Sequence, residues 1–482
     1  MFDFRPILFV VGLLLSTLAV AMVLPAIVDA AAGHADWQVF LAAAGATLFV
    51  GVALVLTTRG ANLAIDVRQA FVLTTAAWVS TCAFGALPFA FAGLDLTYAE
   101  AFFEATSGVT TTGSTVIVGL DRAPPGILLW RALLQWLGGI GLIVMAVALL
   151  PMLHVGGMQL FRTEGRDTAE KILPRAAQIA VGTGLVYLSL TFACTFCYWL
   201  GGMNGFDAIT HAMTTVSTGG YSTSDSSLGK FSTPFIDFVA VVFMIAGALP
   251  FVLWLQAARG RPTALWRDRQ VQTFAGVLAA FVVVITVLLW FNSDRTLLNA
   301  LRVSTVNLVS IVTTTGYATE DYSLWGAFAV TIFFVATFLG GCSGATTGGL
   351  KIFRIQVLYA ASSAQLKRLL RPHGVFIPTF NRRPIGDDVA TSVLSFFFLY
   401  MLSFAAIAIA LAALDIDMVT AVTASATAIG NVGPGLGAIV GPAGTFAPLP
   451  DAAKWILSAG MLLGRLELFT VLVLLAPSFW RR

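Results

Sequence analysis

Four short runs rich in Thr, Ser and Gly recur along this chain, each after a half-apolar segment too short to cross a bilayer. Glycine lacks a Cβ, so it can take positive φ and aim successive main-chain carbonyls at an axis. A ring of such carbonyls can replace the hydration shell of a monovalent cation. The runs therefore predict the four walls of one cation filter. The runs, with the segments before them, are 109–115 after 98–108, 216–222 after 206–215, 312–318 after 298–311, and 426–433 after 418–425.

One glycine of each run serves to align the four, namely Gly113, Gly219, Gly316 and Gly430. The fourth run has no hydroxyl pair before its glycine, so the expected filter is asymmetric. For any single run, an ordinary loop or a small-residue helix contact is the alternative, but four runs in the same position disfavour it. The predicted cation-binding residues are Thr111, Thr112, Gly113, Ser217, Thr218, Gly219, Thr314, Thr315, Gly316, Ala428, Ile429 and Gly430.

Membrane-spanning helices must position these runs. Of the 482 residues, 58% are hydrophobic and 11% charged, against roughly 25% charged in soluble domains. This composition argues against a soluble enzyme and predicts an all-α polytopic membrane protein. Stretches long enough to cross a bilayer predict ten spans, at 7–28, 39–56, 70–92, 127–150, 179–200, 235–255, 274–291, 324–339, 390–414 and 455–475.

The spans group into an N-terminal helix pair and four repeated units. Each unit has a span, a re-entrant segment, a polar run and a second span. Backbone that is not helical is tolerated at membrane depth only where protein buries it or water reaches it, which a pseudo-fourfold arrangement around a shared pore would satisfy. The predicted boundaries are 1–62 for the pair and 63–160, 161–262, 263–372 and 373–482 for the units.

The basic residues predict the orientation. Twenty of the 27 Lys and Arg residues fall in segments on the same side as the two chain ends. Because short cytoplasmic loops carry the basic excess, we expect both termini in the cytoplasm and a multi-pass protein of the cell inner membrane. The first span has no cleavage-type site after it, so it is expected to be retained and not removed as a signal peptide.

Three further motifs carry a resemblance: residues 136–144, the glycine-rich segment 340–351, and the pair Gly464 and Arg465. With the four runs, they resemble the Trk/Ktr/HKT superfamily of K⁺ transporters, and within it the TrkH-type pore subunit, over essentially the whole chain. The resemblance implies a single-chain pore, homodimers, and a cytoplasmic TrkA-type nucleotide-binding regulatory subunit. Relatives that admit Na⁺ often carry Ser at the first aligned glycine, so the resemblance favours K⁺ as the transported ion. No cofactor in this chain is expected.

The eighth predicted span is interrupted by the segment 340–349. Each glycine inside a helix costs about 1 kcal/mol relative to Ala, so a helix is not expected to continue there. The segment resembles the intramembrane loop that obstructs the pore in this family. A phosphate-binding loop is the alternative, but the segment has no Gly-Lys-Ser/Thr ending and no preceding strand. The predicted gate residues in it are Gly340, Gly341, Ser343, Gly344, Thr346, Thr347, Gly348 and Gly349.

Arg465 lies inside the last predicted span, where an arginine costs roughly 2.5–3.5 kcal/mol on insertion scales and usually faces a cavity or a partner. A simple pair with Glu467 is the alternative, but residues two apart lie on different helix faces. We expect Arg465 to face the pore and to repel arriving cations until it moves. Its match to the family's gating arginine indicates the same role.

Other titratable residues carry weaker signals. His154 and His211 are candidates for a proton relay, although lone histidines are more often structural. Glu104 is expected to hold the filter by hydrogen bonds or to add negative potential, as are Asp207 and Asp417. Cys194 and Cys197 fall in an apolar stretch, where free thiols behave as small hydrophobes.

The chain shows no paired intramembrane aspartates and no His-Glu-x-x-His motif, so we do not expect an enzyme. A nucleic-acid partner is not expected either. The sequence favours K⁺ uptake through the filter, gated by the loop and Arg465 under the control of a regulatory subunit. A symporter that couples K⁺ to Na⁺ or H⁺ is the alternative.

Overall fold

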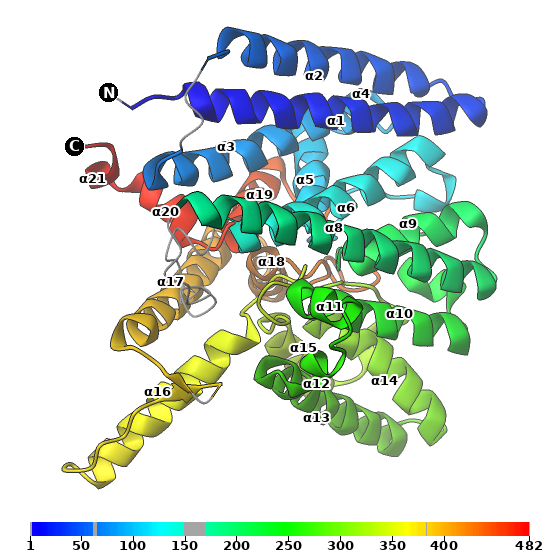
Figure 1. Ribbon diagram of the computed structural model, residues 1–482. Helices are drawn as coiled ribbons and strands as arrows, with labels where there is room; N and C mark the ends of the chain where they lie inside the picture. The colour runs from blue at the N-terminus through cyan, green and yellow to red at the C-terminus, as the bar shows by residue number, and fades with distance from the viewer. Residues whose placement is uncertain (1, 61–64, 149–168, 382, 482) are drawn as a thin grey trace.

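The computed structural model describes residues 2–60, 65–148, 169–381 and 383–481, and within these ranges the chain is built of helices and the loops that join them. The described strands are β1 (Thr379–Phe380) and β2 (Arg383–Pro384), which form one short antiparallel hairpin. Figure 1 shows the helices gathered into one bundle, with both termini on the same side of it. The predicted all-α fold is therefore confirmed.

The N-terminal helices α1 (Arg5–Ala31) and α2 (Trp37–Thr57) lie side by side along one edge of the bundle (Figure 1). They approach closely because small residues face each other, and a Cβ on Gly12 would lie 2.7 Å from the carbonyl oxygen of Gly51. Near the end of α1, the buried Asp29 accepts a 2.6 Å hydrogen bond from the N–H of Gly126. This bond fastens the pair to the start of a helix in the first repeated unit.

Four units follow, each with a re-entrant helix between its spans, as predicted. The first has α3 (Val67–Gly85), α4 (Leu87–Phe91), α5 (Tyr98–Val109) and α6 (Pro125–Ala148); the second α8 (Ala169–Leu200), α9 (Gly205–Val216), α10 (Pro234–Ala248) and α11 (Phe251–Ala258); the third α13 (Arg269–Asn292), α14 (Leu297–Val312), α15 (Ala327–Thr337) and α16 (Ile352–Leu370); the fourth α17 (Asp387–Ala412), α18 (Met418–Gly430), α19 (Asp451–Arg465) and α20 (Phe469–Leu475).

Short helices occupy the connections between these elements. They are η1 (Leu120–Arg122), η3 (Ser227–Phe231) and η4 (Tyr322–Leu324) after the first three polar runs, α12 (Thr263–Arg267) between the second and third units, and α21 (Pro477–Trp480) near the C-terminus.

Each re-entrant helix begins at a side chain that accepts a hydrogen bond from the third residue after it. The capping residues are Thr97, Asn204, Thr296 and Asp417, which are types that satisfy the free N–H groups of a first turn. The first three helices end within a residue or two of their predicted ends. The fourth, α18, continues to Gly430, beyond the predicted end at residue 425.

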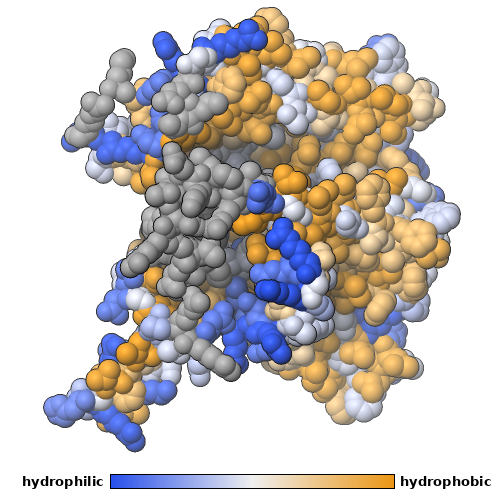
Figure 2. Space-filling model, viewed as in Figure 1, coloured by the Kyte–Doolittle hydropathy of each residue, from blue (hydrophilic) through white to orange (hydrophobic). Residues whose placement is uncertain are grey.

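Seven described helices are long and apolar enough to cross a membrane, and two bent pairs bring the number of candidate spans to nine. The bent pairs are α10 with α11, at 101°, and α19 with α20, at 116°. Helix α15, which corresponds to the eighth predicted span, has only 11 residues, so the count of ten spans stays a prediction. Figure 2 shows hydrophobic residues over much of the visible flank, as a lipid-facing surface requires. The chain is a multi-pass membrane protein.

Candidate functional site

The four loops after the re-entrant helices share one backbone conformation. In each, a residue one or two positions after the helix lies in the left-handed region, and these residues are Thr111 (φ 53°), Thr218 (φ 52°), Thr314 (φ 55°) and Asn431 (φ 52°). The next residue of each loop donates its N–H to a carbonyl five residues back, at distances of 2.8 to 3.1 Å. Two residues after the left-handed residue stands a glycine with positive φ in every loop. These glycines are Gly113, Gly220, Gly316 and Gly433.

This equivalence corrects the predicted alignment in two of the four loops. In the second loop Gly220 and not Gly219 has positive φ, so Gly219 occupies the position of Thr112. The fourth loop is shifted by three residues because α18 continues through Ala428 and Ile429 to Gly430. Those three predicted filter residues therefore lie in the re-entrant helix. Asn431 ends that helix because asparagine tolerates the left-handed conformation better than most residues.

The four loops close into a ring. A Cβ on each of the four positive-φ glycines would lie under 3.0 Å from a main-chain oxygen of the next loop. No side chain larger than glycine fits without displacing that neighbour. The fourth loop meets the first, so the contacts run all the way round one axis. The glycine and oxygen pairs are Gly113 with Gly219, Gly220 with Thr315, Gly316 with Val432, and Gly433 with Thr112.

The electrostatics at this ring favour a cation. All four re-entrant helices end there, and the C-terminus of a helix carries a partial negative charge. Buried hydroxyls add further oxygen atoms, including those of Thr112 and Thr315. Gln135, on α6 and outside the loops, donates a 2.6 Å hydrogen bond to the Gly219 oxygen. Within the ring, Asn431 of the fourth loop donates a 3.0 Å bond to the hydroxyl of Thr112 in the first loop.

The glycine-rich segment 340–349 is a loop that fits into the break between α10 and α11. Its main chain bonds to both sides of that break, through Cys342 N–H to the Ala248 oxygen at 3.0 Å and Phe251 N–H to the Gly344 oxygen at 3.0 Å. An isolated parallel bridge between Leu339 and Leu350 closes the base of the loop. The predicted interruption of the eighth span is therefore confirmed as a folded loop.

This loop forms hydrogen bonds with two of the four loops of the ring. The hydroxyls of Thr218 and Thr346 are 3.0 Å apart, and Gly348 N–H donates a 2.8 Å bond to the hydroxyl of Thr314. Thr111 Oγ1 and Asn431 Oδ1, at the equivalent positions of the other two filter loops, are buried without a hydrogen-bond partner among the described residues. The segment also approaches the fourth loop, because a Cβ on Gly348 would lie under 3.0 Å from both the Gly430 oxygen and the Asn431 Cβ.

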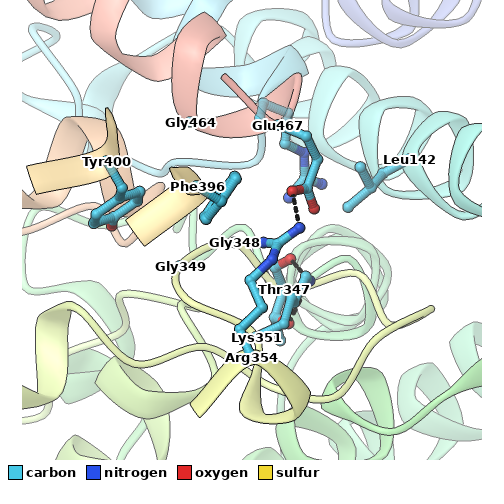
Figure 3. Close-up of a pocket in the computed structure, with 11 residues that line it drawn as sticks. Leu142, Thr347, Gly348, Gly349, Lys351, Arg354, Phe396, Tyr400, Gly464 and Glu467 are labelled. Atoms are coloured by element: carbon cyan, nitrogen blue, oxygen red, sulfur yellow. Dashed lines mark hydrogen bonds and ion pairs between the residues drawn. The ribbon is translucent and has the colours of Figure 1, made fainter. Parts of the chain in front are cut away.

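Arg465 reaches the same segment from the last unit. It is 2% exposed, and its Nη1 donates a 2.9 Å hydrogen bond to the main-chain oxygen of Thr346. Glu467 pairs with Arg354 and not with Arg465 in this structure. Figure 3 shows this ion pair above Thr347 and Lys351, in the pocket that Arg465 also lines. The structure therefore brings Arg465 and the segment 340–349 into contact beside the ring.

Comparison with known proteins agrees with this architecture. A family model described as TrkH, cation transport protein, matches residues 36–482. The chain belongs to the TrkH family. It is 45% identical to the Trk system potassium uptake protein TrkI of Halomonas elongata, over 99% of this chain and 97% of that protein. It is 39% identical to the Trk system potassium uptake protein TrkH of Escherichia coli K12, over 99% of both chains.

A crystal structure of the potassium transporter TrkH from Vibrio parahaemolyticus superposes with a TM-score of 0.93 at 36% identity, with each chain covered fully. The TrkH family is a family of transport proteins, so this member is not an enzyme. The described residues contain no group of His, Cys, Asp and Glu side chains arranged to hold a metal ion.

The weaker candidates in this TrkH-family chain have structural partners. His211 is fully buried, with Nδ1 2.8 Å from the Asp207 oxygen and Nε2 3.0 Å from the Ser222 hydroxyl. Asp417 caps α18 through a 3.0 Å bond from the Thr420 N–H. His154 lies outside the described residues.

Two residues of α6 contact the ring or the loops that form it, although the sequence did not single them out. Arg131 is 1% exposed, and its Nε lies 2.8 Å from a carboxylate oxygen of Glu104. Gln135, one turn further along α6, bonds to the second loop of the ring. A signal for Arg131 was present in the sequence, because a charged residue inside an apolar span is by default a functional candidate. The predicted role of Glu104 in holding its loop is confirmed by the hydrogen bonds that its carboxylate accepts from Thr115 and Val116.

Proposed function

We propose that this chain is a K⁺ uptake protein whose ring of four loops is the selectivity filter. The observation that carries the proposal is the closed contact of each positive-φ glycine with the main-chain oxygen of the next loop. Such a ring holds main-chain oxygens at fixed spacing around one axis, which is the arrangement that replaces the water around a dehydrated cation. The names of the relatives, potassium uptake proteins, support K⁺ as the ion.

The proposed filter follows the structural register. It keeps the nine residues predicted in the first three loops, adds Gly220 to the second, and replaces the three predicted residues of the fourth loop by Asn431, Val432 and Gly433. The second and fourth loops offer fewer hydroxyls at the ring, because Gly219 and Val432 stand where the other two loops have threonine. The filter is therefore chemically asymmetric. The asymmetry comes from Gly219 and Val432 and not, as the sequence alignment indicated, from Ala428 and Ile429.

The gate in this proposal is the segment 340–349 together with Arg465. The segment's contacts with Thr218 and Thr314 support this role, because they hold it against the ring. A buried guanidinium beside it repels a cation that leaves the filter. Movement of both groups away from the axis is required for conduction.

A regulatory subunit is proposed to drive that movement from the cytoplasmic side. The basic excess on the side of the chain ends supports a cytoplasmic location for both termini in the inner membrane. Helix α16 begins immediately after the gate segment and projects from the bundle (Figure 1), so a TrkA-type partner that contacts this helix would act on the gate. Association into homodimers is part of the same proposal.

Uptake of ⁸⁶Rb⁺ into liposomes that contain the purified chain tests the function. We expect uptake that external K⁺ inhibits and Na⁺ does not, with no requirement for a proton or Na⁺ gradient, because a filter alone needs only the gradient of the ion itself. Protein-free liposomes are the control. Uptake that stops without a proton or Na⁺ gradient would identify a symporter, and equal inhibition by Na⁺ and K⁺ would contradict the selective filter.

A further inference from the structure

Each filter loop is tied to its own re-entrant helix by a buried polar side chain near the middle of that helix. In the first three units this side chain stands at the same position, seven residues before the left-handed residue. The residues there are Glu104, His211 and Asn307, all with 0% exposure. They differ in chemistry, being a carboxylate, an imidazole and an amide.

The three side chains perform the same task. Glu104 accepts hydrogen bonds from the Thr115 hydroxyl at 3.0 Å and the Val116 N–H at 2.9 Å. Asn307 accepts from the Thr319 N–H at 3.1 Å and donates to the Thr319 hydroxyl at 2.8 Å. His211 bonds to the Ser222 hydroxyl at 3.0 Å. Each thus holds the outer limb of its loop, the part of the chain that leads away from the ring.

The fourth unit uses a different residue for this contact. Ala424 occupies the equivalent position and has no polar side chain. The neighbouring Thr423 accepts a 3.1 Å bond from the Leu436 N–H and lies 3.2 Å from the Leu436 oxygen. All four loops are therefore held by a buried polar side chain of their own re-entrant helix. The amide of Asn307 and the hydroxyl of Thr423 carry no charge and the imidazole of His211 can be neutral, whereas Glu104 is a carboxylate.

Glu104 is distinguished by an ion pair that reaches a second loop. Arg131 Nε lies 2.8 Å from the Glu104 carboxylate, and Arg131 Nη1 donates a 2.7 Å bond to the Ser222 oxygen of the second loop. The same guanidinium lies 3.9 Å from the ring centre of Tyr221. The Tyr221 hydroxyl closes the set by a 2.8 Å bond to the main-chain oxygen of Glu104.

We propose that Glu104 and Arg131 are positioning residues for ion selectivity, because they fix the first and second filter loops relative to each other. This inference rests on the proposed function of the ring as a K⁺ filter. The contact between Gly113 and the Gly219 oxygen lies between the same two loops. Removing one partner of a buried ion pair costs much more stability than removing one partner of an exposed pair. The spacing of these two loops therefore depends on both charges.

The test compares Glu104→Gln with the wild-type chain in liposomes. Glutamine keeps the size of the side chain and an acceptor oxygen but removes the charge that Arg131 faces. We expect the preference for ⁸⁶Rb⁺ over Na⁺ to fall about tenfold, equivalent to about 1.4 kcal/mol. Arg131→Lys, which keeps the positive charge but loses the two-sided contact with Glu104 and Ser222, is expected to show the same change in preference.

The matched control is Glu100→Gln, one turn earlier on α5. Glu100 also has a basic partner, Lys454, at 2.8 Å, but this pair joins α5 to α19 and does not contact a filter loop. We expect its removal to leave the ratio of Rb⁺ to Na⁺ uptake unchanged. Thermal melting of each purified variant separates a loss of folding from a loss of selectivity.

Tyr221→Phe provides a milder second variant if the charge variants do not fold. It removes only the hydroxyl bonded to Glu104 and Ser114, and a smaller loss of preference, about twofold to threefold and so under 1 kcal/mol, is expected. Wild-type preference retained in Tyr221→Phe and in whichever charge variants fold would overturn the inference. A wild-type chain that itself fails to distinguish Rb⁺ from Na⁺ would overturn the proposed function instead, so the two failures are distinguishable.

Discussion

Arg465 and Thr346 are joined by a hydrogen bond, because the arginine Nη1 lies 2.9 Å from the threonine main-chain oxygen. The two residues come from different units and are 119 positions apart in the sequence. The same threonine contacts Thr218 of the second filter loop through its hydroxyl. One residue of the segment 340–349 therefore links the buried guanidinium to the ring.

We predict that Arg465→Ala and deletion of residues 343–347 each raise Rb⁺ flux in the absence of any partner. The first removes a charge beside the ion path, where a unit pair at 5 Å and a dielectric constant of about 20 is worth about 3 kcal/mol before screening. The second removes the obstruction. Flux into liposomes measures both effects, and Lys454→Ala, at the other end of α19, is the control.

Because the two groups are in contact, their effects should not add. We expect the double variant to gain much less activation free energy than the sum of the two single gains. A full sum would show that Arg465 and the segment act separately. Wild-type flux in both single variants would show that neither is part of a gate.

Gly113→Ser is expected to admit Na⁺. Gly113 has a φ of 90°, and a Cβ there would overlap the Gly219 oxygen of the next loop. The added atoms must therefore move one of the loops, while the hydroxyl offers an additional ligand near the ion. Inhibition of Rb⁺ uptake by Na⁺ measures the change. Gly205→Ser is the control because nothing lies within 4 Å of a Cβ at Gly205, and unchanged discrimination in Gly113→Ser would contradict the prediction.

The register of the second loop leads to a separate prediction. Gly220→Ser should lower K⁺ discrimination much more than Gly219→Ser, since Gly220 has a φ of 74° and faces the Thr315 main chain. The three atoms nearest a Cβ at Gly219 all belong to the end of the Gln135 side chain, which can move at lower cost than main chain. Competition of K⁺ and Na⁺ for Rb⁺ uptake compares the two variants. A larger effect at Gly219 would support the original alignment.

The sequence was sufficient to predict the four units and their re-entrant helices. Runs of small and hydroxyl residues cannot continue an apolar span, and residues such as Thr97 and Asp417 are ordinary helix caps. The sequence did not show which residues of the four runs are structurally equivalent. Where Gly219 and Gly220 stand side by side, only the backbone shows which one takes positive φ, and Asn431 takes the place of a threonine without resembling one.

The partners of the buried charged side chains also could not be predicted from the sequence. Arg131 meets Glu104 at a separation of 27 residues, and which way a side chain points from α6 depends on how that helix packs. The position of Arg465 in an apolar span was enough to select it as a gate candidate. Its contact with Thr346 became visible only with the folded loop.

The orientation is tested by labelling introduced cysteines in intact cells. Trp266→Cys and Leu370→Cys, at positions 76% and 82% exposed, should react only after the membrane is opened. They lie next to Arg267 and Arg371, which belong to the basic excess expected on the cytoplasmic side. Leu324→Cys, 81% exposed, should react from outside. A Cys197→Ser background avoids the native thiol that is only partly buried. The reverse pattern of labelling would invert the proposed topology.

The closed ring also constrains when the protein becomes functional during its synthesis. The bond from the Ser114 hydroxyl to the Gly433 oxygen joins residues 319 positions apart, so the first loop waits for nearly the whole chain to be translated and inserted. Until then Thr112 and Ser114 lack their neighbours, and a ribosome-bound or truncated chain contains three quarters of a ring. A nascent chain therefore cannot close the ring before the last unit arrives.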